Sequence, residues 1–166
     1  MNRRQLMLSG TGLLCVGTPT AQAQAATQTL VGQTLDGKPY DLVQERGKVV
    51  LVFFWATGCA VCRDKMPELR ANYEAWRAKA FQIVAVSLDK SLDDLQSYER
   101  VLSGVVPSSQ RFPSMWRGAA GHADSFGPVP QTPTAFLLDR KGAVVQQMRG
   151  RIAPALWDDI AELVLT

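Results

Sequence analysis

A buried strand that leads directly into two closely spaced cysteines constrains the fold of this chain more than any other feature. Val49–Phe54 is a run of six apolar residues rich in β-branched and aromatic types, which predicts a strand covered on both faces. After it, apolar residues recur at spacings of four and three, which predicts an amphipathic helix. The residues of this helical face are Cys62, Met66, Leu69, Tyr73 and Trp76. Cys59 and Cys62 therefore lie where the strand turns into the helix.

The start of a helix favours the reactive form of cysteine. Free backbone N–H groups and the helix dipole stabilise negative charge there, and the thiolate is the nucleophilic form. At a spacing of three residues the sulfurs of Cys59 and Cys62 can reach each other across one turn. We expect Cys59 to be the exposed nucleophile. Cys62 lies one turn deeper on the apolar face, where it would resolve a mixed disulfide.

Other uses of two cysteines remain open on the residues alone. A structural zinc site usually needs four nitrogen or sulfur ligands, and the chain offers only Cys15 and His122 besides the pair. A purely structural disulfide would close a very short loop and would stabilise the fold weakly. Two buried free thiols are the third alternative.

The N-terminus indicates export. Arg3 and Arg4 precede a short apolar stretch, Leu6–Val16, and two A-x-A sites follow. We predict a signal peptide over residues 1–25, cleaved after Ala23 or Ala25, and a periplasmic location. The paired arginines leave the Sec and twin-arginine routes unresolved.

Residues 26–166 remain, enough for one domain with a real core. Arg3 and Arg4 supply two of the three net positive charges, so the mature chain is close to neutral. With no basic run, nucleic acid is not an expected partner. No second apolar stretch is long enough to span a membrane.

Strand and helix patterns alternate along this domain. Asp36-Gly37 marks the turn of a hairpin-like segment within residues 26–48. Apolar runs and turns predict strands at residues 48–54, 81–87, 134–138 and 143–148. Helical patterns and caps predict helices at about residues 59–78, 91–101 and from 154, the first of them kinked at Pro67. We also expect a short strand near Arg111–Met115 and one helical turn at Ala123–Phe126. The pattern predicts an α/β sandwich with a mixed sheet.

Two motifs together resemble the thioredoxin superfamily. They are Phe54-Trp55-Ala56-Thr57-x-Cys59-x-x-Cys62-Arg63, with Met66-Pro67 downstream, and Thr132-Pro133-Thr134-Ala135-Phe136-Leu137-Leu138-Asp139. The chain looks most like the exported thiol-disulfide oxidoreductases of the TlpA/ResA type. The resemblance implies a thioredoxin-like α/β fold. Its mixed central sheet would be flanked by helices and extended by an N-terminal β-hairpin.

The resemblance also implies roles for residues outside the cysteine pair. The Thr132–Pro133 bond would be cis and the Thr132 backbone would pair with an extended substrate. A trans proline at a strand entrance is the alternative without the resemblance. Trp55 would pack beside the active site as part of the substrate-binding region, although plain core packing also accounts for an aromatic residue there.

Several positions depart from the family pattern. Gly58 replaces a bulky residue before the first cysteine, and Ala60-Val61 replaces the usual dipeptide. Phe53 stands where cytoplasmic thioredoxins carry a buried Asp. Lys65 replaces a Glu found in many TlpA/ResA-type proteins. An ammonium one turn after Cys62 would lower the thiol pKa, so Lys65 is a candidate for tuning it; the alternative is a silent, solvated lysine.

The resemblance implies an exported thiol-disulfide oxidoreductase that needs no cofactor or metal beyond its own redox-active disulfide. Partners would be exported thiol or disulfide proteins such as cytochrome c apoproteins, and a membrane thiol-electron transporter would be the reductant. The same site run in reverse would oxidise thiols. A copper chaperone would use His122 as a third ligand. A peroxiredoxin needs Pro-x-x-x-Thr-x-x-Cys, and Val52 and Ala56 occupy those Pro and Thr positions before Cys59.

Overall fold

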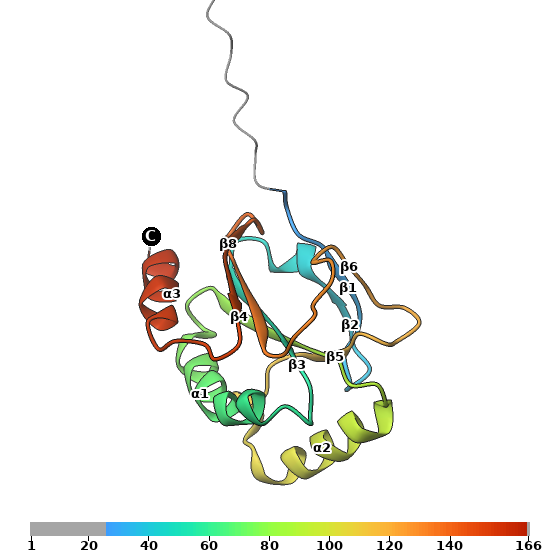
Figure 1. The fold of residues 1–166 in the computed structure, drawn as a ribbon. Coiled ribbons are helices and arrows are strands. Elements are labelled where there is room, and N and C mark those ends of the chain that lie inside the picture. Colours follow the sequence, from blue (N-terminus) through green and yellow to red (C-terminus); the bar gives the residue numbers. More distant parts are fainter. Residues whose placement is uncertain (1–25, 166) are drawn as a thin grey trace, which may run out of the picture.

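The computed structural model describes residues 26–165. The predicted signal peptide, residues 1–25, lies outside the described residues. The elements run in the order β1, β2, η1, β3, α1, β4, α2, η2, β5, β6, β7, β8 and α3 (Figure 1).

A five-stranded mixed sheet forms the centre of the domain, with the strand order β5-β4-β3-β7-β8. Its strands are β3 (Val49–Trp55), β4 (Phe81–Ser87), β5 (Ser114–Trp116), β7 (Thr134–Leu138) and β8 (Val144–Arg149). Strand β4 is parallel to both β3 and β5, whereas β7 is antiparallel to β3 and β8. This arrangement confirms the predicted α/β class and mixed sheet.

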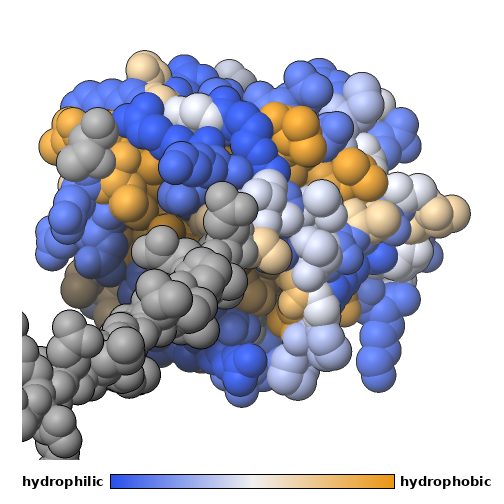
Figure 2. Space-filling model, turned by 90° about the horizontal axis from the view of Figure 1, so that it is seen from above, coloured by the Kyte–Doolittle hydropathy of each residue, from blue (hydrophilic) through white to orange (hydrophobic). Residues whose placement is uncertain are grey.

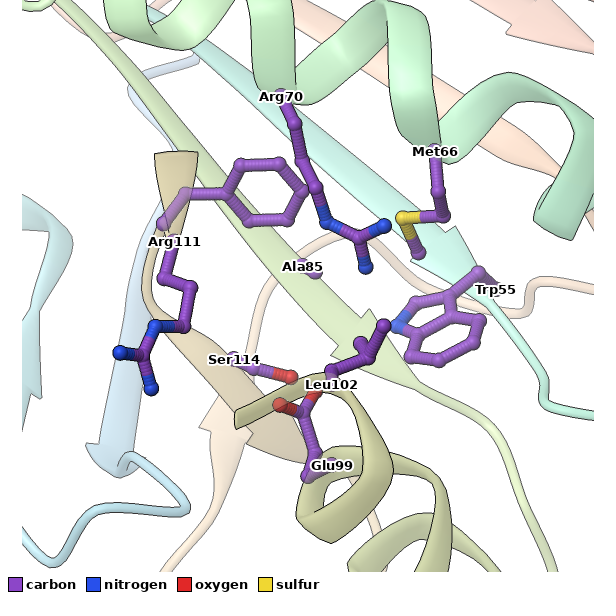
Figure 3. A pocket seen from close by; sticks show the side chains of 9 residues that line it. Trp55, Met66, Arg70, Ala85, Glu99, Leu102, Arg111 and Ser114 are labelled. Atoms are coloured by element: carbon purple, nitrogen blue, oxygen red, sulfur yellow. The ribbon is translucent and has the colours of Figure 1, made fainter. Parts of the chain in front are cut away.

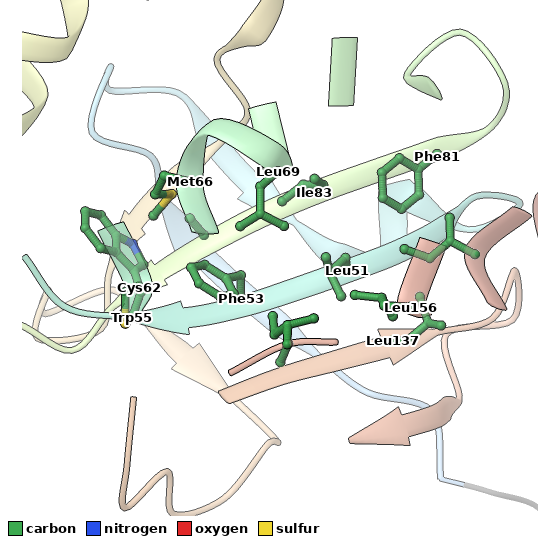
Figure 4. Close-up of a cluster of buried hydrophobic side chains, with 14 of the residues drawn as sticks. Leu51, Phe53, Trp55, Cys62, Met66, Leu69, Phe81, Ile83, Leu137 and Leu156 are labelled. Atoms are coloured by element: carbon green, nitrogen blue, oxygen red, sulfur yellow. The ribbon is translucent and has the colours of Figure 1, made fainter. Parts of the chain in front are cut away.

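Strand β3 is buried along its whole length, as its composition predicts. Alternate side chains of a strand point to opposite faces, so β3 contributes to two cores. Leu51, Phe53 and Trp55 join a cluster with Cys62 and Leu69 on one face (Figure 4). The intervening residues join a second cluster on the other face, namely Val50, Val52 and Phe54. The strand that leads to the cysteines is thus held from both sides.

The described residues form three α-helices beside the sheet, α1 (Ala60–Trp76), α2 (Leu92–Val105) and α3 (Leu156–Leu165). Helix α1 continues through Pro67. The Ser91 side chain accepts a hydrogen bond from Asp93 N–H and caps α2, as the sequence predicts. Helix α3 buries Leu156, Ile160 and Val164 in the first cluster, so α1 and α3 cover the same face of the sheet.

A small three-stranded sheet covers the other face, with the order β2-β1-β6. Strands β1 (Leu30–Gln33) and β2 (Pro39–Asp41) form the predicted antiparallel hairpin, and the 3-10 helix η1 (Leu42–Glu45) follows. A second 3-10 helix, η2 (Ser108–Gln110), precedes β5. The helical turn predicted at Ala123–Phe126 is wrong. Residues Ala123–Asp124 are strand β6, because they pair with Leu30 and Val31 of β1.

A helix that spans a bilayer is long and mostly apolar. Among residues 26–165, no helix is both long enough and apolar enough to cross a bilayer. On the face in Figure 2, hydrophobic side chains are interspersed with hydrophilic ones. The large apolar residues that are most exposed are Val101, Val105 and Leu165.

Candidate redox site

The cysteines lie at one end of the central sheet, between β3 and α1. Strand β3 ends at Trp55, four residues before Cys59, and Cys59 is the N-cap residue of α1. The backbone of Cys59 is extended, with φ −84° and ψ 104°, which is typical of an N-cap. The predicted placement of the pair at the strand-to-helix junction is confirmed.

Cys59 and Cys62 are joined by a disulfide bond. The backbone N–H of Cys62 donates a hydrogen bond to Cys59 Sγ at 3.1 Å. This donor belongs to the first turn of α1, so it would stabilise negative charge on that sulfur after reduction. Cys62 is 0% exposed, whereas Cys59 is partly exposed. The two residues therefore differ in exposure, whereas the roles of Cys59 as nucleophile and Cys62 as resolving thiol stay predictions.

Asp89 organises the segment that precedes the cysteines, and the sequence reasoning missed it. Its carboxylate accepts hydrogen bonds from Thr57 N–H at 3.0 Å, Thr57 Oγ1 at 2.8 Å and Ser87 Oγ at 2.6 Å. Arg63 of α1 donates to the Thr57 carbonyl. A signal was present in the sequence, because Asp89 follows a buried strand parallel to β3, and such strands end at the same edge of a sheet.

The second motif lies at the same end of the sheet. Thr134, the first residue of β7, pairs with Phe54 near the end of β3. The Thr132–Pro133 peptide bond is cis, as the resemblance implied. Pro133 is buried, Thr132 is partly exposed, and Gly150 N–H donates to the Pro133 carbonyl at 2.8 Å. The topology therefore brings both motifs to one edge; the part of Thr132 and Pro133 in substrate binding stays a prediction.

Trp55 is 1% exposed and lies in the core beside the site. Its ring packs on Tyr98 of α2 at a centroid distance of 5.0 Å. Its indole N–H is buried and has no hydrogen-bond partner among the described residues. Any effect of Trp55 on a bound substrate must therefore act through packing, and its substrate-binding role stays a prediction.

Lys65 is buried rather than solvated, with 9% of its surface exposed. Its ammonium donates hydrogen bonds to Glu68 Oε1 at 2.7 Å and to the Ile152 carbonyl at 3.0 Å. Trp157 of α3 also donates its indole N–H to Glu68 Oε1. Burial raises the pKa of Glu68, but the hydrogen bonds from Lys65 and Trp157 outweigh it and hold that pKa below its ordinary value. Lys65 thus joins α1 to the segment before α3, and Glu68 joins α1 to α3 itself through Trp157. The effect of Lys65 on the thiol pKa stays a prediction.

A hollow of about 170 Å³ lies beside this lysine, between Val61 of the cysteine motif and Ile152.

His122 lies elsewhere, next to β6, where its Nε2 is 2.9 Å from Asp124 Oδ2. The His122 side chain is only 3% exposed. Among residues 26–165, no three or more His, Cys, Asp or Glu side chains are grouped to hold a metal ion.

Known proteins of similar sequence are named as redox proteins. The chain is 28% identical over 116 residues to the thiol-disulfide oxidoreductase ResA of Bacillus thuringiensis subsp. konkukian (strain 97-27), which covers 70% of this chain and 63% of that protein. It is 26% identical over 129 residues to ResA of Bacillus subtilis (strain 168), covering 78% and 68%. The chain therefore spans 63% of the length of the first of these relatives.

Solved structures and a family match agree with this similarity. The thioredoxin domain of a thiol-disulfide oxidoreductase from Bacteroides vulgatus is 25% identical, with a TM-score of 0.64 over 86% of this chain and 98% of that one. A thioredoxin family protein from Chlorobium tepidum TLS, named a thiol:disulfide interchange protein, shares the fold at 23% identity, with a TM-score of 0.68 over 88% of this chain and 100% of that one. The AhpC/TSA family matches residues 19–147. With its thioredoxin-like fold and TlpA/ResA-type motifs, the chain belongs to the AhpC/TSA family.

Proposed function

We propose that this protein is an exported thiol-disulfide oxidoreductase that uses Cys59 and Cys62 as its redox pair. The observation that carries the proposal is the Cys59–Cys62 disulfide at the N-terminus of α1, with Cys59 partly exposed and Cys62 buried. The ResA-named relatives support the same chemistry.

The proposed reaction runs through a mixed disulfide. Reduced Cys59 attacks one sulfur of a partner disulfide, and the other partner sulfur leaves as a thiolate. Cys62 then loses its proton and attacks Cys59 Sγ, which releases the second partner sulfur and re-forms the Cys59–Cys62 bond. The partner gains two electrons, which the pair loses. No cofactor takes part.

The finer parts of the proposal follow from the resemblance to TlpA/ResA-type proteins. Substrates would be disulfides of exported proteins, including cytochrome c apoproteins, and a membrane thiol-electron transporter would restore the dithiol. Residues 1–25 would direct the chain to the periplasm and be removed after Ala23 or Ala25. Thr132 and Pro133 would hold an extended substrate segment beside Cys59.

A trapping experiment tests the roles of the two sulfurs. The Cys62→Ser variant keeps the attacking thiol but lacks the resolving one, so disulfide-linked adducts with partner proteins should accumulate on non-reducing gels of periplasmic extract. Mass spectrometry of the adducts would identify the substrates. The matched Cys59→Ser variant keeps only the buried sulfur and should give few adducts. Equal trapping by both variants, or by neither, contradicts the assigned roles.

A further inference from the structure

Glu99 of α2 is a carboxylic acid that lines a small cavity next to the core cluster of Cys62. The cavity has a volume of about 20 Å³, enough for one water molecule. Trp55 and Met66 form one side of it, and Ser114 of β5 lies next to Glu99 (Figure 3). No step proposed so far uses this acid.

Two polar atoms on the cavity wall are buried, Trp55 Nε1 and Ser114 Oγ. Within residues 26–165 the indole N–H has no hydrogen-bond partner, and the Ser114 hydroxyl interacts with the Glu99 carboxyl alone. In Figure 3 the indole nitrogen of Trp55 faces the cavity, and the Ser114 hydroxyl points toward the Glu99 carboxyl. One water molecule there could accept from the indole N–H and donate to the carboxylate. The cavity thus offers a hydrogen-bonded link between Glu99 and Trp55.

The cavity wall is shared with the redox pair. Trp55 and Met66 belong to the same buried cluster as Cys62 (Figure 4), and Met66 lies one turn after Cys62 on α1. Neither position at which thioredoxin-like relatives carry a nearby acid has one here, since Phe53 and Lys65 occupy them. Glu99 is therefore a half-buried acid that shares its cavity with Trp55 and Met66, two members of the Cys62 cluster.

Glu99 also lines a second, larger cavity of about 480 Å³, where exposed residues such as Lys38 and Arg111 form part of the wall. This gives its carboxyl a route for proton exchange with solvent. Burial raises the pKa of Glu99, opposed by the Ser114 hydroxyl and by the charges of Arg70 and Arg111. The titratable and charged groups that line the two cavities with it are Arg70 and Tyr73 of α1, Arg111 before β5, and Asp36, Lys38 and Tyr40 of the hairpin.

We propose that Glu99 is a proton-linked positioning residue of the redox pair, which binds a proton when the Cys59–Cys62 disulfide is reduced and releases it when the disulfide re-forms. The proposal rests on the redox function proposed above. The physical reason is that a thiolate on Cys59 disfavours a second negative charge in the poorly solvated region behind it.

The protons and electrons balance with glutathione as the reductant. Two glutathione thiols supply two electrons and two protons and become one disulfide, while the Cys59–Cys62 bond breaks. One proton binds to Cys62 Sγ and the other to the Glu99 carboxylate, and Cys59 remains a thiolate. Re-oxidation reverses each transfer.

The test is the equilibrium constant for reduction by glutathione, measured from about pH 5 to 7.5 in the wild type and in Glu99→Gln. The ratio of the wild-type constant to the variant constant should rise about threefold to tenfold as the pH falls, because one unit of pKa difference between redox states changes this ratio tenfold. Asp94→Asn is the matched control, since it removes an exposed carboxylate from the same helix. The equilibrium constant of this control should depend on pH in the same way as that of the wild type.

A second variant keeps the test informative if Glu99→Gln folds poorly. Ser114→Ala removes the hydroxyl that lowers the pKa of Glu99, so the pH-dependent change should move to higher pH. Two results would overturn the role of Glu99 while leaving the redox function intact. One is an equilibrium constant that depends on pH in the same way in the wild type and in Glu99→Gln. The other is a pH dependence that does not move in Ser114→Ala. A wild-type protein that reaches no equilibrium with glutathione would overturn both.

Discussion

At the scale of single residues, the charge of Lys65 beside the cysteines is paired rather than free. Lys65 stands one turn after Cys62, and its ammonium is bound to Glu68 and to the Ile152 carbonyl. The field of a buried cation at the sulfurs is reduced by a carboxylate that lies 2.7 Å from it. We therefore expect Lys65 to lower the pKa of the Cys59 thiol and Glu68 to raise it.

Replacing Lys65 and replacing Glu68 should shift the pKa of Cys59 in opposite directions. Lys65→Met removes a positive charge and leaves Glu68, so the pKa of Cys59 should rise by roughly half a unit or less. Glu68→Gln leaves the ammonium without its counter-charge, so that pKa should fall by a similar amount. The measurement is thiolate absorbance near 240 nm against pH in the reduced proteins. Superimposable curves for all three proteins would show that neither charge reaches the sulfur.

At the scale of elements, the segment between β3 and α1 depends on a side chain from the neighbouring strand. Asp89 lies just beyond β4, and its carboxylate holds both the N–H and the hydroxyl of Thr57. A loop that is tied to a second element in this way presents Cys59 at a fixed position relative to the sheet.

Removing this carboxylate should cost stability. Asp89→Ala deprives Thr57 and Ser87 of their acceptor, and we expect the free energy of unfolding to fall by about 2–3 kcal/mol. Thr57→Val removes only one of these hydrogen bonds and should lower it by about 1 kcal/mol. Urea unfolding at pH 7 measures both values. If Asp89→Ala unfolds at the same urea concentration as the exposed-site variant Asp94→Asn, the proposed role of Asp89 is wrong.

The elements that could be predicted are those specified by their own residues. Strand β3 and helix α1 follow from local patterns of apolar residues, and their predicted ends differ from the observed ones by only a few positions. Strand β6 could not be predicted in this way. It has two residues, and it is a strand only because the chain folds back onto β1, some ninety positions earlier.

The same distinction applies to the candidate site. The spacing of Cys59 and Cys62, and the strand and helix patterns on either side of them, predict the redox pair directly. Asp89 is marked only by its place after a buried strand, because its partner Thr57 is distant in sequence. Glu99 has no such mark, since it is its neighbourhood to Trp55 and Ser114 in the fold that singles it out. Burial of Lys65 likewise depends on the Ile152 carbonyl, 87 residues away.

At the scale of the whole molecule, the disulfide closes a loop of only a few residues, so the redox state changes the unfolded chain little. The difference in stability between the oxidised and reduced protein then reports the direction in which the pair transfers electrons. A disulfide that oxidises its partners is one whose reduced form is the more stable.

For a protein that works as a reductant, the oxidised form should be the more stable one by about 1–3 kcal/mol. Urea unfolding with and without a reductant measures the difference. The double variant Cys59→Ser/Cys62→Ser is the control, and its unfolding should not respond to the reductant. A reduced protein that is more stable than the oxidised one would instead indicate a thiol oxidant.

The hairpin that precedes β3 closes one side of the central sheet. Strand β5 lies at the edge of that sheet, and the hairpin turn covers it, since Leu35 N–H donates to the Ser114 carbonyl at 2.8 Å and Thr34 forms a bridge with Met115. Without these residues, β5 would present unpaired backbone groups to other chains. Trimming the chain back to β3 would also uncover the second apolar cluster, which Leu30, Tyr40 and Leu42 cover, so we expect the shortened protein to self-associate.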